Sequence, residues 1–390
     1  MKPRKIKDDV FWVGAVDWDR RLFDSLMPLP DGTSYNAYLI RGSEKTALLD
    51  TVEPAMAAAL FAQLAHVSNI DYVISHHAEQ DHSGTLPVIL QRYPGAKLVA
   101  SSKAKGLLTD HLGIPEDRFQ IVADGDSLSL GDKTLRFIYT PWVHWPETMC
   151  TYLPEDRILF SCDFFGSHLA TSDLFSQDDD FVLEAVKTYY ATIMMPFRLA
   201  IQKNLEKIKG LAFDYIAPSH GPIHSQPSLV VNAYRGWVDD RLANLAVIAY
   251  ASMHGSTRQM VQHLVGALVE QGVTVQQFDL ASASLEKLAA SLVDAATVIF
   301  ATPTVNGGPH PLVAYAAYLA NILKPKVKFA SVIGSYGWGG KTVDQLTGLV
   351  PNLKLELLNP IMCKGLPREA DFRALDQLAA SIAEKHQSLN

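Results

Sequence analysis

Seven side chains that can bind metal ions lie at spacings that chance rarely supplies. Four of them fall within the short segment His77–His82, which has donors at its first, third, fifth and sixth positions. The other three follow singly further along the chain. Seven donors exceed what one tetrahedral ion accepts, so the set predicts two ions that share a bridging carboxylate. The full set is His77, Glu79, Asp81, His82, His144, Asp163 and His220.

The donor types indicate which metals this site prefers. Three of the seven are carboxylates and none is a thiolate. Zinc hydrolases built on similar segments tend to have a nitrogen donor where Glu79 stands. A carboxylate there hardens the site and favours iron or manganese over zinc. Asp163 has two oxygens and is therefore the natural candidate for the bridge.

The remaining histidines show no such pattern, because a single His or Asp in a loop is more often solvated or capping than a ligand. Asp50, at the end of an expected strand, is interpreted as a supporting or structural carboxylate. Tyr189 and Tyr190 precede an apolar stretch and have two open interpretations, the wall of a substrate pocket or the core of a helix. The histidines given this ordinary interpretation are His66, His76, His111, His168, His224, His263 and His386.

A second group of residues, in three loops, predicts a flat, phosphorylated cofactor. The first loop opens a helix, where hydroxyls and backbone N–H groups form an anion site, and Gly255 lets the backbone close tightly around a phosphate. The other two loops are long and rich in glycine, and the third contains the aromatic residues Tyr336 and Trp338. All three follow parallel strands, at whose carboxyl ends open α/β sheets bind ligands. The residues assigned to the cofactor are Ser252, Met253, His254, Gly255, Ser256, Thr257, Pro303, Thr304, Val305, Asn306, Gly307, Ser335, Tyr336, Gly337, Trp338 and Gly339.

Composition is that of an ordinary globular protein, and the length favours two domains over three. The chain has 390 residues, of which 48% are hydrophobic and 19% charged. A net charge of −7 without a basic stripe argues against nucleic-acid binding. No window approaches the roughly 18 apolar residues of a membrane helix, and no signal peptide is recognisable. The three cysteines lack CxxC spacing, which fits a cytoplasmic protein and excludes an iron–sulfur cluster within this chain.

The pattern of expected elements divides the chain into residues 1–244 and residues 245–390. In the first part, short strands are followed by loops, and every candidate metal ligand lies in such a loop. A long helix is expected over residues 179–204, and a polar helix around residues 236–244. In the second part, strands and helices alternate strictly, which predicts a parallel, doubly wound sheet. Its last strand is expected over residues 354–360.

The ligand series resembles that of the flavodiiron proteins, which are A-type oxygen and nitric oxide reductases. The flanking strings Ser83-Gly84, Trp145-Pro146 and Gly221-Pro222 are similar as well, and the resemblance covers essentially the whole chain. It implies an α/β fold, with an N-terminal metallo-β-lactamase-like αββα sandwich at residues 1–244. A flavodoxin-like doubly wound parallel sheet that binds FMN would follow at residues 245–390.

The resemblance also implies a role for each ligand. One iron would be bound by His77, Glu79 and His144, and the other by Asp81, His82 and His220, with Asp163 bridging the two. In some members of the family the residue that matches His82 is not bound to iron. The implied activity is the reduction of O2 to water, of NO to N2O, or of both, at a non-haem diiron centre that receives electrons through FMN.

Partners follow from the same resemblance. The flavin loops and the metal loops belong to separate domains, and flavodiiron proteins bring them together in a head-to-tail homodimer. Such a dimer, or a dimer of dimers, is therefore expected here. Electrons would come from an external donor such as rubredoxin or a flavin reductase, and neither nucleic acid nor membrane is an expected partner.

Two other classes of protein remain open at this point. One is a zinc hydrolase of the metallo-β-lactamase superfamily fused to a flavodoxin, against which Glu79 and the complete ligand set argue. The other is a non-catalytic electron-transfer module with structural metals, although structural sites usually favour Cys and His over carboxylates. The preference between O2 and NO cannot be read from these residues.

Overall fold

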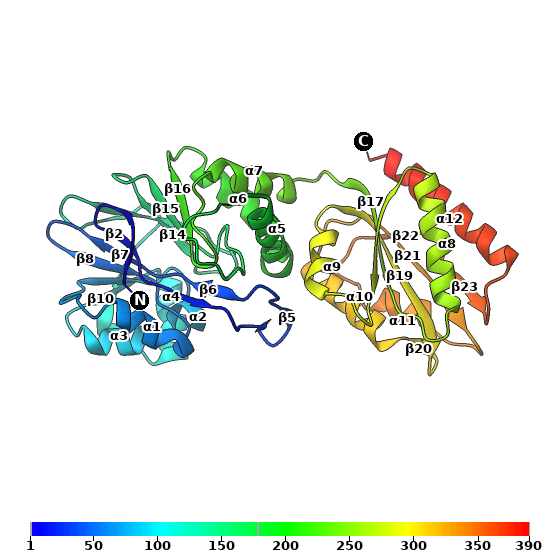
Figure 1. Ribbon diagram of the computed structural model, residues 1–390, viewed down its shortest axis with the longest axis horizontal. Helices are drawn as coiled ribbons and strands as arrows, with labels where there is room; N and C mark the ends of the chain where they lie inside the picture. Colours follow the sequence, from blue (N-terminus) through cyan, green and yellow to red (C-terminus); the bar gives the residue numbers. More distant parts are fainter. Residues whose placement is uncertain (1, 178, 390) are drawn as a thin grey trace. The chain divides into compact units, whose positions relative to one another are not determined.

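The computed structural model describes residues 2–177 and 179–389, and the chain divides into two compact units (Figure 1). The first unit comprises Met1–Tyr189 and Phe197–Val238. The second comprises Tyr190–Pro196 and Asp239–Asn390. The domain boundary at residue 244 stays a prediction. None of the helices in the described part of the chain combines the length and the apolarity that crossing a membrane requires.

The first unit contains two β-sheets, with helices beside both (Figure 1). The larger sheet has the order β1 (Arg4–Lys7), β2 (Val10–Trp12), β7 (Tyr38–Arg41), β8 (Thr46–Leu49), β9 (Tyr72–Ile74), β10 (Lys97–Ala100) and β11 (Phe119–Ile121). The smaller sheet has the order β12 (Ser127–Ser129), β13 (Thr134–Tyr139), β14 (Met149–Leu153), β15 (Ile158–Cys162) and β16 (Tyr215–Pro218). Two short hairpin pairs complete the strands, β3 (Ala15–Asp17) with β6 (Thr33–Tyr35) and β4 (Leu22–Phe23) with β5 (Met27–Pro28).

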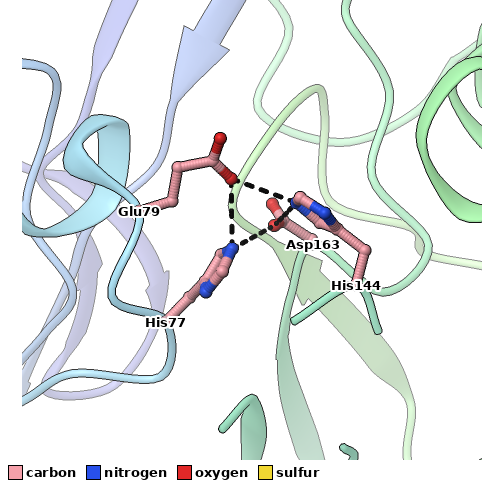
Figure 2. Close-up of side chains that lie close together, drawn as sticks. All are labelled: His77, Glu79, His144 and Asp163. Atoms are coloured by element: carbon pink, nitrogen blue, oxygen red, sulfur yellow. Dashed lines mark hydrogen bonds and ion pairs between the residues drawn. The ribbon is translucent and has the colours of Figure 1, made fainter. Parts of the chain in front are cut away.

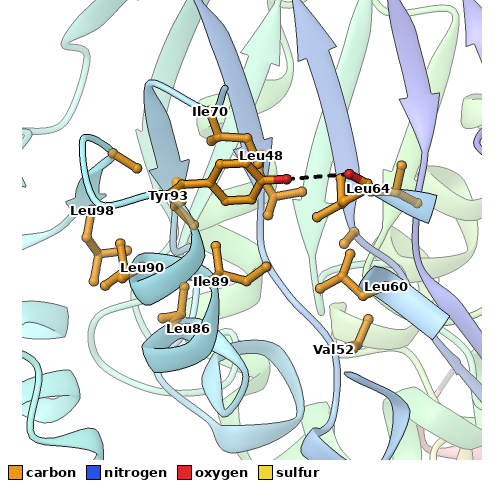
Figure 3. Close-up of a cluster of buried hydrophobic side chains, with 14 of the residues drawn as sticks. Leu48, Val52, Leu60, Leu64, Ile70, Leu86, Ile89, Leu90, Tyr93 and Leu98 are labelled. Carbon is orange, nitrogen blue, oxygen red and sulfur yellow. Dashed lines mark hydrogen bonds between the residues drawn. The ribbon is translucent and has the colours of Figure 1, made fainter. Parts of the chain in front are cut away.

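Two apolar layers hold this unit together. Between the sheets, Ile40 and Leu49 of the larger sheet share a buried cluster with Phe137 and Phe160 of the smaller one. Successive side chains of a strand point to opposite faces, so neighbouring residues such as Leu48 enter the outer layer instead. There they pack on the helices α1 (Ala57–Gln63), α3 (Leu86–Arg92) and α4 (Ser102–Leu112), as Figure 3 shows for the first two helices. On the other side, Figure 1 shows α5 (Asp179–Tyr189), α6 (Arg198–Ile208) and α7 (Pro227–Val238) beside the smaller sheet.

The second unit is a parallel sheet between two helical layers. Its strand order is β18 (Thr274–Asp279), β17 (Ala243–Tyr250), β19 (Ala295–Val305), β21 (Phe329–Tyr336) and β22 (Glu356–Leu357), with β23 (Ile361–Lys364) also paired to β21. Side chains of α8 (Ser256–Glu270) and α12 (Glu369–Gln387) fill one buried cluster. Those of α9 (Leu285–Leu292), α10 (Pro311–Leu323) and α11 (Thr342–Gly348) fill the cluster on the other face. This is the doubly wound architecture that the alternating pattern predicts, in the strand order of flavodoxins.

Three expected elements are wrong in detail. The helix expected over residues 179–204 ends at Tyr189 and resumes at Arg198, after a π-helical turn at Tyr190–Met194. Pro196 accounts for the break, because it lacks an N–H group and disfavours helical backbone at the residue before it. The polar helix around residues 236–244 is instead the end of α7 followed by the start of β17. The strand over residues 354–360 is split into β22 and β23 before and after Pro360.

Candidate metal centre

The seven predicted ligands come together at one end of the strands of the first unit. His77 and Glu79 lie in the loop after β9, whereas Asp81 and His82 lie in the one-turn helix α2 (Gln80–Ser83) rather than in a loop. The turn from extended backbone at Glu79 into this helix changes the direction of the side chains that follow. The remaining ligands follow strands of the smaller sheet, namely His144 between β13 and β14, Asp163 after β15 and His220 after β16.

The first ligand group consists of His77, Glu79, His144 and Asp163 (Figure 2). Glu79 Oε2 lies 3.1 Å from His77 Nε2 and 3.0 Å from His144 Nε2. Asp163 Oδ2 lies 3.5 Å and 3.4 Å from the same two nitrogens. All four donor atoms therefore surround one point, as the ligands of a single metal ion do.

The second ligand group consists of Asp81, His82 and His220, with Asp163 beside it. Asp81 Oδ1 lies 3.3 Å from His82 Nε2, and Asp81 Oδ2 lies 3.3 Å from His220 Nε2. Asp163 Oδ1 lies 3.1 Å from His82 Nε2 and 3.4 Å from His220 Nε2. The two oxygens of Asp163 thus face different groups, which is the arrangement of a carboxylate that bridges two ions.

Several buried polar atoms of these ligands have no hydrogen bond in the described part of the chain, which indicates whether the pocket suits metal ions. Both oxygens of Asp81, both oxygens of Asp163 and His82 Nε2 are buried, and none forms a hydrogen bond of suitable geometry with the described residues. Such atoms are costly in a protein interior unless something compensates them. Divalent cations compensate anionic oxygens directly, so the donor set fits two hard metal ions.

The pKa values of the four imidazoles rise where they face these carboxylates. Burial lowers the pKa of His77, but its hydrogen bonds with Glu147 and Glu79 outweigh burial and raise it to about 10. The pKa of His220 likewise rises to about 10, and those of His82 and His144 rise to about 9. Without metal, therefore, imidazolium and carboxylate groups neutralise one another here, and metal ions must displace those protons.

Glu147 is a supporting residue that sequence reasoning missed. Its Oε1 accepts hydrogen bonds from His77 Nδ1 at 2.7 Å and from the backbone N–H of Ala78 at 3.0 Å. On the other side of the cluster, His220 Nδ1 donates to the carbonyl oxygen of Ser34 at 2.7 Å. Both contacts leave Nε2 free to face the ligand cluster. Glu147 is the third residue after His144, but no pattern in the sequence marks it.

Asp50 and His76 form a support beneath the ligands. Asp50 accepts hydrogen bonds from the backbone N–H of His76 at 2.8 Å and from its Nδ1 at 2.6 Å. His76 Nε2 contacts Thr151 Oγ1 at 2.7 Å, so both ring nitrogens are engaged away from the ligand cluster. Asp50 is therefore a supporting carboxylate, as interpreted from the sequence. His76, for which a solvated or capping role is expected, is instead buried and hydrogen-bonded through both ring nitrogens.

Two aromatic residues near His220 line the second ligand group. The ring of Tyr189 lies 5.9 Å from the ring of His220, and the ring of His168 lies 5.1 Å from it. His168, for which no role is predicted from the sequence, also packs against Phe23 of the β4–β5 hairpin. Of the two tyrosines considered, Tyr189 therefore lies beside the ligands, and Tyr190 is fully buried.

The three loops assigned to a cofactor lie at the carboxyl ends of β17, β19 and β21. Gly255, at the N-cap of α8, has a φ of +93°, which favours glycine over other residues. Thr257 Oγ1 and Ser335 Oγ are 3.2 Å apart and connect the first loop to the third. A pocket of about 380 Å³ adjoins the second and third loops at Thr304 and Tyr336. The side chain of Trp338 is 82% exposed and is available to cover a flat ring.

Fold and site define a metallo-β-lactamase-like metal domain joined to a flavodoxin domain, and comparisons with known proteins agree. Residues 33–221 match the family described as "ODP family beta lactamase", and residues 248–375 match "Flavodoxin". The nitric oxide reductase of Moorella thermoacetica is 36% identical, over 98% of this chain and 99% of that protein. The rubredoxin-oxygen oxidoreductase of Megalodesulfovibrio gigas is 33% identical, over 98% of both chains.

Solved structures give the same result. Rubredoxin oxygen:oxidoreductase from Desulfovibrio gigas superposes with a TM-score of 0.96 and 31% identity, covering 100% of this chain and 99% of that one. The flavodiiron protein from Giardia intestinalis gives a TM-score of 0.93 and 27% identity, covering 100% and 98%. The chain belongs to the flavodiiron protein family. It is an oxidoreductase whose cofactors are FMN and a non-haem diiron centre.

Proposed function

We propose that this protein reduces O2 to water, NO to N2O, or both, with electrons from an external donor. The observation that carries this proposal is that the two carboxylate oxygens of Asp163 face different ligand groups. Oδ2 faces His77 and His144, whereas Oδ1 faces His82 and His220. When bound, the iron pair and FMN supply the redox chemistry. The protein contributes the ligand geometry and excludes side reactions.

The ligand assignment follows the two groups in the structure. His77, Glu79 and His144 would hold one iron, Asp81, His82 and His220 would hold the other, and Asp163 would contact both. Burial supports this assignment, because His77 and Asp163 are at most 1% exposed and are shielded from bulk water. Tyr189 and His168 lie beside the second group, with their rings 5.9 Å and 5.1 Å from that of His220.

The flavin assignment uses the three loops of the second unit. Residues 252–257 bind the 5′-phosphate of FMN with hydroxyls and the backbone N–H groups at the start of α8. Residues 303–307 and 335–339 flank the isoalloxazine ring. The hydrogen-bonding distance between Thr257 and Ser335 supports this, because it holds the phosphate loop against one of the ring loops.

The assembly that we propose is a head-to-tail homodimer, alone or paired into a dimer of dimers. Metal ligands and flavin loops belong to different compact units of the chain, and a second copy would bring a flavin loop beside each metal site. Light scattering tests this directly, since a monomer with full turnover contradicts it. We also infer a cytoplasmic location and a donor such as rubredoxin or a flavin reductase. The similarity to a rubredoxin-oxygen oxidoreductase supports this choice of donor.

The test of the proposed function is parallel turnover of O2 and NO with one chemically reduced donor. Iron and FMN contents are measured first, and zinc-loaded protein is the control. We expect consumption of at least one substrate by the iron-loaded protein and none by the zinc-loaded protein. Full reductive activity with zinc alone, or slow reoxidation without multi-electron stoichiometry, would refute the proposal in favour of a hydrolase or an electron carrier.

A further inference from the structure

Glu147 and His77 form a fully buried pair at the edge of the first ligand group. Neither side chain is exposed to solvent, and Glu147 Oε1 lies 2.7 Å from His77 Nδ1. The same oxygen accepts the N–H group of Ala78, which fixes the carboxylate against the backbone of the ligand loop. The second oxygen, Oε2, is buried and has no hydrogen-bond partner among the described residues. A carboxylate in this position accepts a hydrogen bond from Nδ1–H, which keeps the proton on Nδ1 and leaves the lone pair of Nε2 for a metal.

The two ligand groups differ in this supporting contact. His220 in the second group donates its Nδ1 proton to the neutral carbonyl oxygen of Ser34. His77 in the first group donates to a carboxylate. A charge-assisted hydrogen bond is roughly twice as strong as a neutral one. An imidazole that shares its proton with an anion is also the more basic metal ligand.

The negative charge of Glu147 also affects the charge balance of the metal centre. Glu79, Asp81 and Asp163 provide three negative charges, whereas two ferrous ions carry four positive charges. Glu147 is a fourth carboxylate at the centre, although it does not reach the donor cluster itself. Because these charges lie in a buried pocket with little solvent screening, a fourth anion on one side affects the nearer iron more than the farther one.

We propose that Glu147 is a positioning residue that fixes the metal-binding tautomer of His77 and makes the iron of the first ligand group the more electron-rich of the two. This inference rests on the proposed function, because it requires His77 to bind iron. The two irons are then electronically inequivalent through a difference outside their direct ligands, namely a carboxylate behind His77 and a carbonyl behind His220.

The test compares Glu147→Gln with the wild type and with Glu44→Gln, an exposed glutamate. Gln conserves the shape of Glu147 but removes its charge. In the ⁵⁷Fe Mössbauer spectrum of the diferrous protein, we expect the signal of one iron to shift and that of the other to stay. One iron is also expected to be lost to a chelator about 10- to 100-fold more readily. The FMN content and the FMN reduction potential should not change.

A further variant separates positioning from simple structural damage. Glu147→Asp keeps the charge on a shorter side chain, and we expect it to retain iron better than Glu147→Gln. Equal iron loss in the two variants, or two unshifted iron signals in Glu147→Gln, would overturn the inference. The proposed function fails separately, when the wild-type protein itself binds no iron pair or reduces neither substrate.

Discussion

Oδ1 of Asp163 lies 3.1 Å from Nε2 of His82, inside the same buried cluster as the other ligands. The His82 side chain is 2% exposed, and its Nε2 has no hydrogen bond among the described residues. The family resemblance leaves open whether this position binds iron. Here the side chain already points at Asp163, the proposed bridge, so a ligand role for His82 is the stronger prediction.

We therefore expect His82→Ala to lower the iron content from about two ions per chain toward one. Loss of one imidazole leaves Asp81 and His220 as the remaining donors of the second group besides Asp163. Metal analysis checks this, with His66→Ala as the control because His66 is exposed. An unchanged iron content in His82→Ala would show that the position is not a ligand.

Replacement of the bridge should have a larger effect. Asp163→Ala removes a donor from both groups, so we expect both irons to bind weakly and turnover to be abolished. Glu79→Ala removes a donor from the first group and should also abolish turnover. FMN content stays unchanged in both variants, because the flavin loops belong to the other unit. Asp117→Ala, at an exposed position, is the control, and activity that survives in Asp163→Ala contradicts the site assignment.

The pH dependence of the metal-free protein follows from the raised pKa values of its histidines. A raised pKa in the folded state stabilises the protein fully below the unfolded pKa of 6.5 and loses that effect as the pH rises through about 9 to 10. The pKa of Glu79 is lowered from 4.5, because its contacts with His144 and His77 outweigh burial, so its contribution is present above that value and is lost in acid. We expect the melting temperature of the metal-free protein to be highest between pH values of about 4.5 and 6.5.

Thermal unfolding across a pH series checks this expectation. Iron affinity should increase as the pH rises above 6.5, whereas the melting temperature of the metal-free protein falls. Metal binding must release the same imidazole protons, and their loss becomes easier at higher pH. Asp163→Asn serves as the comparison, since the loss of that charge weakens the pairing and should flatten the profile. A melting temperature that stays constant from pH 6.5 to pH 9 would contradict the prediction.

The outer apolar layer of the first unit gives a stability prediction. Ile89 on α3 is fully buried among Leu48, Leu60 and Leu86 (Figure 3). Ile89→Ala should lower the free energy of unfolding of this unit by about 2–5 kcal/mol, because it leaves a cavity. Val88→Ala on the same helix is the matched control, since Val88 is 48% exposed. Denaturant unfolding measures both variants, and similar losses in the two would contradict this account of the core.

Gly255 gives a prediction for the flavin site. A methyl group at this position meets no atom within 4 Å, but the φ of +93° is strained for any L side chain. Gly255→Ala should therefore destabilise the backbone conformation of the phosphate loop by about 1–3 kcal/mol and weaken the binding free energy of FMN by a similar amount. Gly266→Ala, within the same helix α8 and equally open, is the control and should bind FMN normally. Fluorescence titration of FMN measures both constants, and equal affinities would exclude a role for this backbone conformation.

Much of the fold and most of the metal donors can be predicted from the sequence, because the residue patterns that indicate them are local. Four donors lie within six consecutive residues, so their spacing alone indicates a metal site; they are His77, Glu79, Asp81 and His82. In the second unit, each strand or helix carries its own apolar pattern, so the alternation alone predicts the doubly wound sheet that the structure shows. The helix expected across Tyr190–Met194 fails because apolar periodicity continues through a segment whose backbone Pro196 interrupts.

The residues by themselves do not show which donors belong together, a pairing that only the family resemblance implied; the tertiary structure shows the two groups and the residues behind them. The assignment of Asp163 oxygens to two groups depends on how loops from two sheets converge, and no local pattern records that convergence. Glu147 lies 70 residues from His77 along the chain, yet their side chains meet at 2.7 Å. Donor identity is a property of single residues and was fixed by the sequence alone. The pairing of donors and the electrostatics around them depend on contacts between distant segments, which exist only after both sheets have packed.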